Sequence, residues 1–117
     1  MNEKKEILTV LGGGESGVGA AVLGKTKGMQ VFLSDMGDIS DHYREILDSE
    51  GIEYETGHHT EERILEADVV VKSPGIPPCS PIVRKIMEKG IPVISEIEFA
   101  ARYTDAKMVC ITGSNGK

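Results

Sequence analysis

Residues 7–17 read Ile-Leu-Thr-Val-Leu-Gly-Gly-Gly-Glu-Ser-Gly, a short apolar strand that runs directly into a glycine-rich loop. The loop fits the pattern Gly-x-Gly-x-x-Gly at Gly12, Gly14 and Gly17, and a helical segment of small residues follows it. In dinucleotide-binding domains such glycines allow a tight turn and a close backbone approach to a pyrophosphate. Asp35 ends the next strand, where these domains place an acid for a ribose hydroxyl. The stretch predicts phosphate binding, against the simpler alternative of a structural turn.

Outward from this unit, apolar strand-like runs alternate with helical segments. Strands are expected at residues 7–11, 30–35, 52–55, 68–72, 91–94 and 107–112. Helices are expected at residues 17–27, 41–50, 81–89 and 95–103, with a shorter one after residue 60. The alternation predicts an α/β fold, namely a Rossmann-like, doubly wound, mostly parallel five-stranded sheet with helices on both faces. The last strand is assigned to a further unit, so the expected domains are residues 1–104 and 105–117.

A second turn, Ser73-Pro74-Gly75-Ile76, follows the fourth expected strand. In a parallel sheet this position lies at the carboxyl edge, beside the glycine loop, where ligands of such folds bind. Gly75 would let the main chain approach a ligand, although a rigid turn into the next helix is an equally good interpretation. Lys72 is expected to be solvated, and His58 and His59 are interpreted as a polar surface loop rather than a metal site.

Composition limits the possible functions. The 117 residues hold 13 Lys and Arg against 19 Asp and Glu, a formal charge of −6, which disfavours a general role on nucleic acid or anionic membranes. The two cysteines, Cys79 and Cys110, lack the spacing of a zinc site and fit a reducing compartment. Neither an export signal nor a membrane-length apolar run is visible. We therefore expect a soluble cytoplasmic protein with no metal site of its own.

The sequence closes on an apolar strand that enters Gly113-Ser114-Asn115-Gly116-Lys117, a phosphate-binding loop of the form Gly-x-x-Gly-Lys. Such a loop needs the N-terminal amides of a following helix to hold phosphates. We therefore expect the front piece of a longer nucleotide-using enzyme, cut at the start of an ATP-binding domain.

The order of five sequence features along the chain indicates a family. These features are the glycine loop, Asp35, Ser73-Pro74-Gly75-Ile76, Glu96-Ile97-Glu98-Phe99, and Ile111 to Lys117. In this order they resemble the Mur ligases, most closely the members that add D-glutamate, over essentially the whole chain. The resemblance implies a three-domain cytoplasmic enzyme of peptidoglycan synthesis. Its first domain would hold the uridine diphosphate of UDP-N-acetylmuramoyl-L-alanine, its second ATP and Mg²⁺, and its third the D-glutamate.

The reaction implied by the resemblance is an ATP-dependent amide ligation. The substrate carboxylate takes the γ-phosphoryl group to form an acyl phosphate, which the amine of D-glutamate attacks, while Mg²⁺ and the loop lysine stabilise the transferring charge. Residues 1–117 do not contain a complete set of catalytic residues. This piece alone is therefore expected to be inactive and to require no cofactor.

The resemblance also implies site residues. The uridine diphosphate contacts would be Gly14, Glu15, Ser16, Gly17, Asp35, Met36 and Gly75. The ATP contacts would be Gly113, Ser114, Asn115, Gly116 and Lys117. Within the first loop, Glu15 is expected to point outward and Ser16 to offer its hydroxyl. The alternative function is an NAD(P)-binding Rossmann domain of a dehydrogenase or a dinucleotide-sensing regulatory module.

Overall fold

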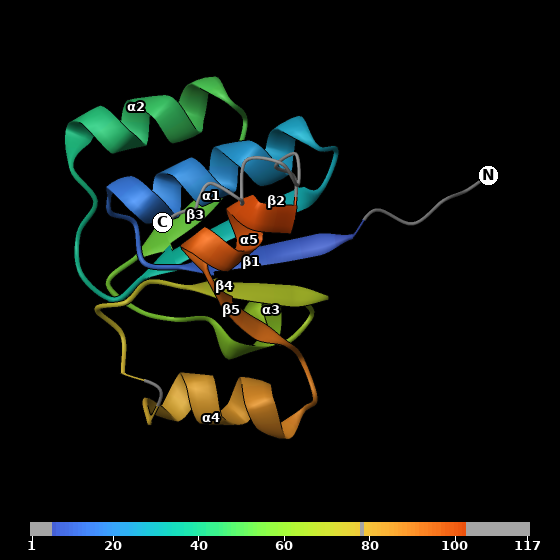
Figure 1. Ribbon diagram of the computed structural model, residues 1–117. Coiled ribbons are helices and arrows are strands. Elements are labelled where there is room, and N and C mark those ends of the chain that lie inside the picture. Colours follow the sequence, from blue (N-terminus) through green and yellow to red (C-terminus); the bar gives the residue numbers. More distant parts are fainter. Residues whose placement is uncertain (1–5, 78, 103–117) are drawn as a thin grey trace, which may run out of the picture.

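The computed structural model of the protein describes residues 6–77 and 79–102. Its strands form one parallel sheet in the order β3-β2-β1-β4-β5, which confirms the predicted doubly wound fold (Figure 1). The strands are β1 (Ile7–Leu11), β2 (Gln30–Asp35), β3 (Glu53–Thr56), β4 (Val69–Lys72) and β5 (Val93–Ser95). The first two strands begin and end at the residues predicted from the sequence.

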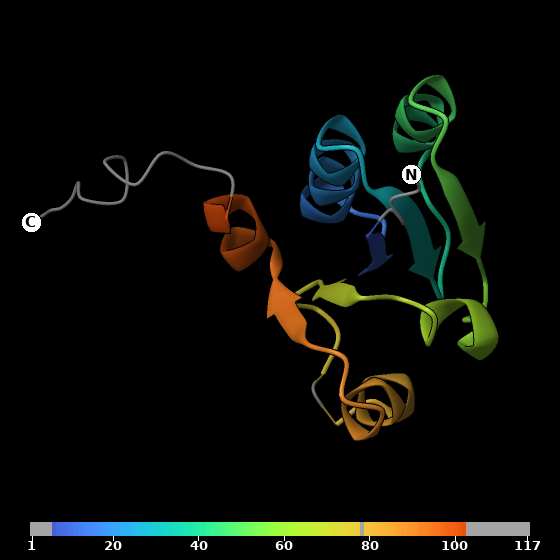
Figure 2. The ribbon, with the colours of Figure 1, turned by 90° about the vertical axis from the view of Figure 1, so that its right-hand side faces the viewer.

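The helices cover both faces of the sheet. They are α1 (Glu15–Thr26), α2 (Asp41–Ser49), α3 (Glu61–Ile64), α4 (Pro81–Glu88) and α5 (Glu96–Arg102). Helices α1, α2 and α5 lie on one face, while α3 and α4 lie on the other (Figures 1 and 2). The arrangement follows from right-handed crossovers that wind outward from β1 in both directions.

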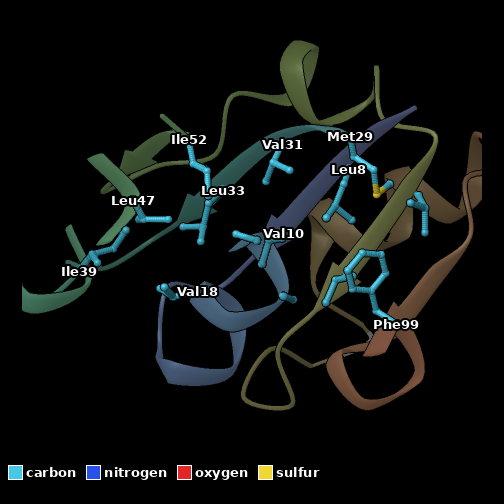
Figure 3. Packing of buried hydrophobic residues seen from close by; sticks show 14 residues of the cluster. Leu8, Val10, Val18, Met29, Val31, Leu33, Ile39, Leu47, Ile52 and Phe99 are labelled. Carbon is cyan, nitrogen blue, oxygen red and sulfur yellow. The ribbon is translucent and has the colours of Figure 1, made fainter. Parts of the chain in front are cut away.

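Alternating side chains of the strands contribute to two hydrophobic cores, one on each face of the sheet. In β1, Leu8 and Val10 pack toward α1, α2 and α5, together with Phe99 of α5 (Figure 3). Leu11 points to the opposite face and packs toward α3 and α4. Both faces of β1 are therefore buried, as expected for a central parallel strand.

Three helices end in the same way. A glycine at positive φ follows the helix, and the glycine and the next residue both donate backbone hydrogen bonds to carbonyl groups of the last helical turn. At the end of α4, Gly90 N–H donates to the Met87 carbonyl and Ile91 N–H to the Ile86 carbonyl, a Schellman motif. Gly28 and Gly51 close α1 and α2 with the same pattern. The residue after each glycine is thus still bonded to the helix.

Some predicted features lie outside the described residues. These are the strand at 107–112, the terminal loop at 113–117, Cys110 and the boundary between residues 104 and 105. Among the helices that the structure does describe, none has the length and apolar character needed to cross a bilayer.

Candidate functional site

The turns that leave β1 and β4 are in direct contact at the carboxyl edge of the sheet. Ser73 N–H donates to the Leu11 carbonyl at 3.0 Å, and a Cβ built on Gly12 would lie only 2.7 Å from the Ser73 Cβ. Gly12 also has a φ of +108°, which other residues rarely adopt. Because β1 and β4 flank the point where the chain changes winding direction, this edge is the ligand-binding crevice of a doubly wound fold.

The three glycines of the motif have different local surroundings. A Cβ on Gly17 would lie 1.9 Å from the Gly12 carbonyl oxygen, so a glycine there lets α1 start directly against the loop. A Cβ on Gly14 would meet no protein atom within 4 Å, and the same holds for Gly75 in the second turn. Nothing in the described fold requires a glycine at these two positions, and both line the crevice.

The crevice is a pocket of about 710 Å³. Its lining comes from both turns, from the end of β2, from the loop before α3 and from the start of α4: Gly12, Gly13, Gly14, Asp35, Met36, His58, His59, Glu61, Ser73, Gly75, Ile76, Pro77, Ser80, Pro81 and Ile82. The volume falls within the range of small-molecule sites. Four of the predicted contacts, Gly14, Asp35, Met36 and Gly75, are thus brought together in one pocket.

Backbone amides at the start of α1 have no intramolecular acceptor. The helix begins at Glu15, two residues earlier than predicted, and its first internal bond runs from Val18 N–H to the Gly14 carbonyl. Within the described residues, the N–H groups of Gly14 to Gly17 donate no hydrogen bond. Such orphan amides, together with the positive end of the helix dipole, are chemically suited to holding an anion.

Asp35 positions the loop. Its Oδ2 accepts from Gly13 N–H at 2.7 Å and its Oδ1 accepts from Gly37 N–H at 2.8 Å. The Gly13 amide is therefore not available to a ligand, in contrast to the amides that follow it. Asp35 still lines the pocket, and a carboxylate has lone pairs left for a further donor.

Lys72 holds the second turn together. Its ammonium donates to the Ile76 carbonyl at 2.7 Å and, more weakly, to the Ser73 carbonyl at 3.4 Å. The expectation of a solvated lysine is therefore wrong, because the turn carbonyls are within its reach and it is half-buried. The Gly75 amide makes only a long contact, 3.4 Å to Ser73 Oγ, and lies on the pocket wall.

A polar network under the pocket was not anticipated from the sequence. Glu55 accepts from Ser34 Oγ at 2.7 Å, from Thr60 N–H at 2.6 Å and from the Thr60 hydroxyl at 2.5 Å. His58 Nε2 lies 3.0 Å from Glu55 Oε1, the oxygen that also accepts from the Thr60 hydroxyl, and His59 Nδ1 lies 2.6 Å from Ser34 Oγ. His58 and His59 thus lie on the wall of the pocket and not merely on a surface loop. The hint in the sequence was a serine near the end of a buried strand, facing a loop of polar residues.

Two pKa values shift in this network. Burial by itself raises the pKa of Glu55, but the hydrogen bonds from Thr60 and Ser34 outweigh it, so the net pKa is lowered. Burial lowers the pKa of His59, although the nearby Glu55 and Asp35 act in the opposite direction. At neutral pH, Glu55 is therefore ionised and His59 is neutral. No cluster that could hold a metal ion occurs among the described residues.

The remaining predicted contacts lie outside the pocket. Glu15 is exposed, as expected. Ser16 lines a smaller pocket between α1 and α5, beside Glu96, so its side chain belongs to a different surface from Gly14. Gly17 is buried under the loop. The predicted ATP contacts, Gly113 to Lys117, lie outside the described residues.

The fold defines the class of the protein, a Rossmann-like domain with a crevice at its topological switch point. The sequence narrows this class, because residues 7–82 match the model of the MurD N-terminal domain family. The chain belongs to this family. This does not favour the alternative of a dehydrogenase or dinucleotide-sensing module.

Individual relatives support the same family assignment. The chain is 64% identical over 110 residues to the UDP-N-acetylmuramoylalanine–D-glutamate ligase of Bacteroides thetaiotaomicron, covering 94% of the chain and 25% of that protein. It is 58% identical over 117 residues to the ligase of the same name from Porphyromonas gingivalis, covering all of the chain and 26% of that protein. The chain thus spans about a quarter of the length of these ligases.

A solved structure shares the fold. The murein peptide ligase Mpl of Psychrobacter arcticus superposes with a TM-score of 0.74 at 20% identity, covering 83% of this chain and 20% of that one. At this identity the likeness shows the fold alone.

Proposed function

We propose that the chain is the domain that binds the uridine diphosphate of UDP-N-acetylmuramoyl-L-alanine in an ATP-dependent D-glutamate ligase of peptidoglycan synthesis. The observation that carries the proposal is the contact between the two turns, which brings the unpaired amides of Gly14 to Gly17 and the open backbone at Gly75 to one edge of the sheet. The diphosphate would lie against these amides. The nucleoside would extend toward Asp35 and Met36.

Helix dipoles, not side-chain cations, would supply the positive potential. The described residues that line the pocket include no lysine or arginine, whereas the first residues of α4 and the preceding Ser80 lie in its wall. The Ser80 side chain makes no capping hydrogen bond. Partial charges at helix ends are weaker than full charges. We therefore expect the domain alone to bind uridine diphosphate in the high-micromolar to millimolar range.

The steps that use ATP, Mg²⁺ and D-glutamate would belong to the rest of a longer cytoplasmic protein. The relatives are about four times as long as this chain, and both curated relatives are named D-glutamate ligases. Residues 113–117 would begin the ATP site, and residue 105 would begin the second domain. Alone, the chain would bind substrate without catalysing ligation.

A pair of glycine variants, one at the N-cap of α1 and one within α1, tests the phosphate site. In Gly14→Ala the methyl group meets no protein atom but lies beside the amides that would hold the diphosphate, so we expect about tenfold weaker binding of UDP. Gly19→Ala, within α1 but outside the large pocket, should bind UDP as the unsubstituted chain does. Isothermal titration calorimetry measures both. Equal affinity of the two variants, or tighter binding of NAD than of UDP, would contradict the proposal.

A further inference from the structure

Ser34 Oγ is surrounded by three polar atoms but has only one proton to donate. It lies 2.7 Å from Glu55 Oε2, 3.2 Å from the His58 carbonyl oxygen and 2.6 Å from His59 Nδ1. Ser34 is fully buried, so its hydroxyl must form its hydrogen bonds with these three neighbours and not with water. Of the three neighbours, only the imidazole nitrogen can carry a proton of its own when Glu55 is ionised.

The ionisation state of Glu55 determines which neighbour accepts the hydrogen bond that the Ser34 hydroxyl donates. The Thr60 amide donates to this carboxylate without ambiguity, and the Thr60 hydroxyl and His58 Nε2 also contact it. Donors of this kind favour the ionised form, which only accepts hydrogen bonds. The Ser34 hydroxyl must therefore donate to Glu55, because otherwise two oxygens 2.7 Å apart would face each other with no proton between them.

The tautomer of His59 follows in turn. Since the Ser34 proton is committed to Glu55, the contact of 2.6 Å requires His59 Nδ1–H to donate to Ser34 Oγ. A neutral ring protonated at Nδ1 has a bare lone pair at Nε2. Burial lowers the pKa of His59 against the opposing effect of Glu55 and Asp35, and His58 adds to the lowering, which keeps the ring neutral.

Nε2 of His59 has no partner within the described residues, and the half-buried ring lines the same pocket as Asp35 and Met36. We propose that His59 presents Nε2 to the pocket as a hydrogen-bond acceptor and selects nucleotides whose nucleoside carries a donor at that point. The role rests on the proposed nucleotide binding. The lone pair of His59 Nε2 would repel a phosphate oxygen. The nucleoside, and not the diphosphate, is therefore the part of the ligand that Nε2 would contact. Uridine offers two kinds of donor, the imide N–H of the base and the ribose hydroxyls.

The first test needs no ligand. Nitrogen-15 NMR of labelled histidine distinguishes the protonated from the bare ring nitrogen in each of the three histidines. We expect His59 to be protonated at Nδ1 and His58, which donates to Glu55 through Nε2, to be protonated at Nε2. His42→Leu, at an exposed position outside the pocket, helps to assign the signals. A proton on Nε2 of neutral His59 would overturn the inference.

The second test is calorimetric titration with UDP. His59→Leu removes the acceptor and should weaken binding about tenfold, whereas His59→Gln places a carbonyl oxygen near the Nε2 position and should bind within about threefold of the unsubstituted chain. His42→Leu should leave the affinity unchanged. Equal affinity of His59→Leu and the unsubstituted chain would overturn the role of His59.

Analogues identify the donor. N3-methyl-UDP lacks the imide N–H, and 2′-deoxy-UDP and 3′-deoxy-UDP each lack one ribose hydroxyl. The analogue without the relevant donor should lose about tenfold on the unsubstituted chain and almost nothing on His59→Leu. Equal losses on both chains for every analogue would overturn the inference. If UDP does not bind the unsubstituted chain at millimolar concentration, both the proposed function and the binding role of His59 fail. The NMR experiment still tests the tautomer of His59 in that case.

Discussion

Glu55 and His59 make the stability of the domain depend on pH at the scale of single residues. Burial by itself raises the pKa of Glu55, but the hydrogen bonds to its carboxylate outweigh that effect and lower the pKa from 4.5. The pKa of His59 is lowered from 6.5, mainly by burial. In both cases the unfolded chain binds protons more readily than the folded chain in the acid range. The stability that each group contributes is therefore complete above its unfolded pKa and is lost as the pH falls.

We expect the free energy of unfolding to fall in two steps on acidification. The first begins below pH 6.5, where unfolded His59 protonates, and the second below pH 4.5, where unfolded Glu55 does. Urea denaturation at a series of pH values measures both steps. Because both groups are partly exposed, each step should be small compared with the total stability.

Glu55→Gln is the matched variant for the second step. The amide cannot ionise, so the decrease below pH 4.5 should become shallower. At neutral pH the variant should be less stable by about 1–3 kcal/mol, because the substituted amide cannot accept all the hydrogen bonds that the carboxylate does. An unchanged pH profile would show that Glu55 does not contribute to the acid sensitivity.

At the scale of elements, the start of α1 depends on how closely it approaches the loop before it. Gly17→Ala would place a methyl carbon 1.9 Å from the Gly12 carbonyl oxygen, so the backbone must shift. We expect a loss of about 2 kcal/mol or more, read from urea denaturation midpoints. Gly19→Ala in the same helix has open space and should gain up to about 1 kcal/mol through helix propensity. A Gly17→Ala variant as stable as Gly19→Ala would contradict the close contact.

The positions of the elements could be predicted from the sequence because hydrophobic alternation and glycine punctuation are local signals. The strand starts at Ile52 and Ile91 were predicted too early, since both residues still donate to the carbonyl oxygens of the preceding helix. Helix α1 begins two residues earlier than the sequence predicts, with Gly14 at its N-cap position.

The polar network could not be predicted in the same way. Its members, Ser34, Glu55, His59 and Thr60, come from β2, β3 and the loop before α3, and only the folded sheet brings them together. The contacts of Lys72 could not be predicted for a similar reason, because its partner carbonyls depend on the path of the turn that follows it. In contrast, Gly14, Asp35, Met36 and Gly75 lie at or just after strand ends, and the carboxyl ends of parallel strands meet at one edge.

At the scale of the whole molecule, the strand order places the two glycine turns side by side at one edge of the sheet. Strands β1 and β4 are neighbours although α1, β2, α2, β3 and α3 separate them in the chain. The doubly wound topology thus builds the pocket from distant segments. This arrangement is the basis for the nucleotide-binding role that we propose for the chain.

Residue-resolved NMR titration of the labelled 117-residue chain with UDP is the most direct test of that role. We predict that the amide signals of Gly14 to Gly17 and of Gly75 shift together and saturate with a single affinity. Gly28 and Gly90, which end α1 and α4 at the opposite edge, should stay unmoved. Shifts spread over both edges, or the absence of shifts at the two turns at millimolar UDP, would contradict the account.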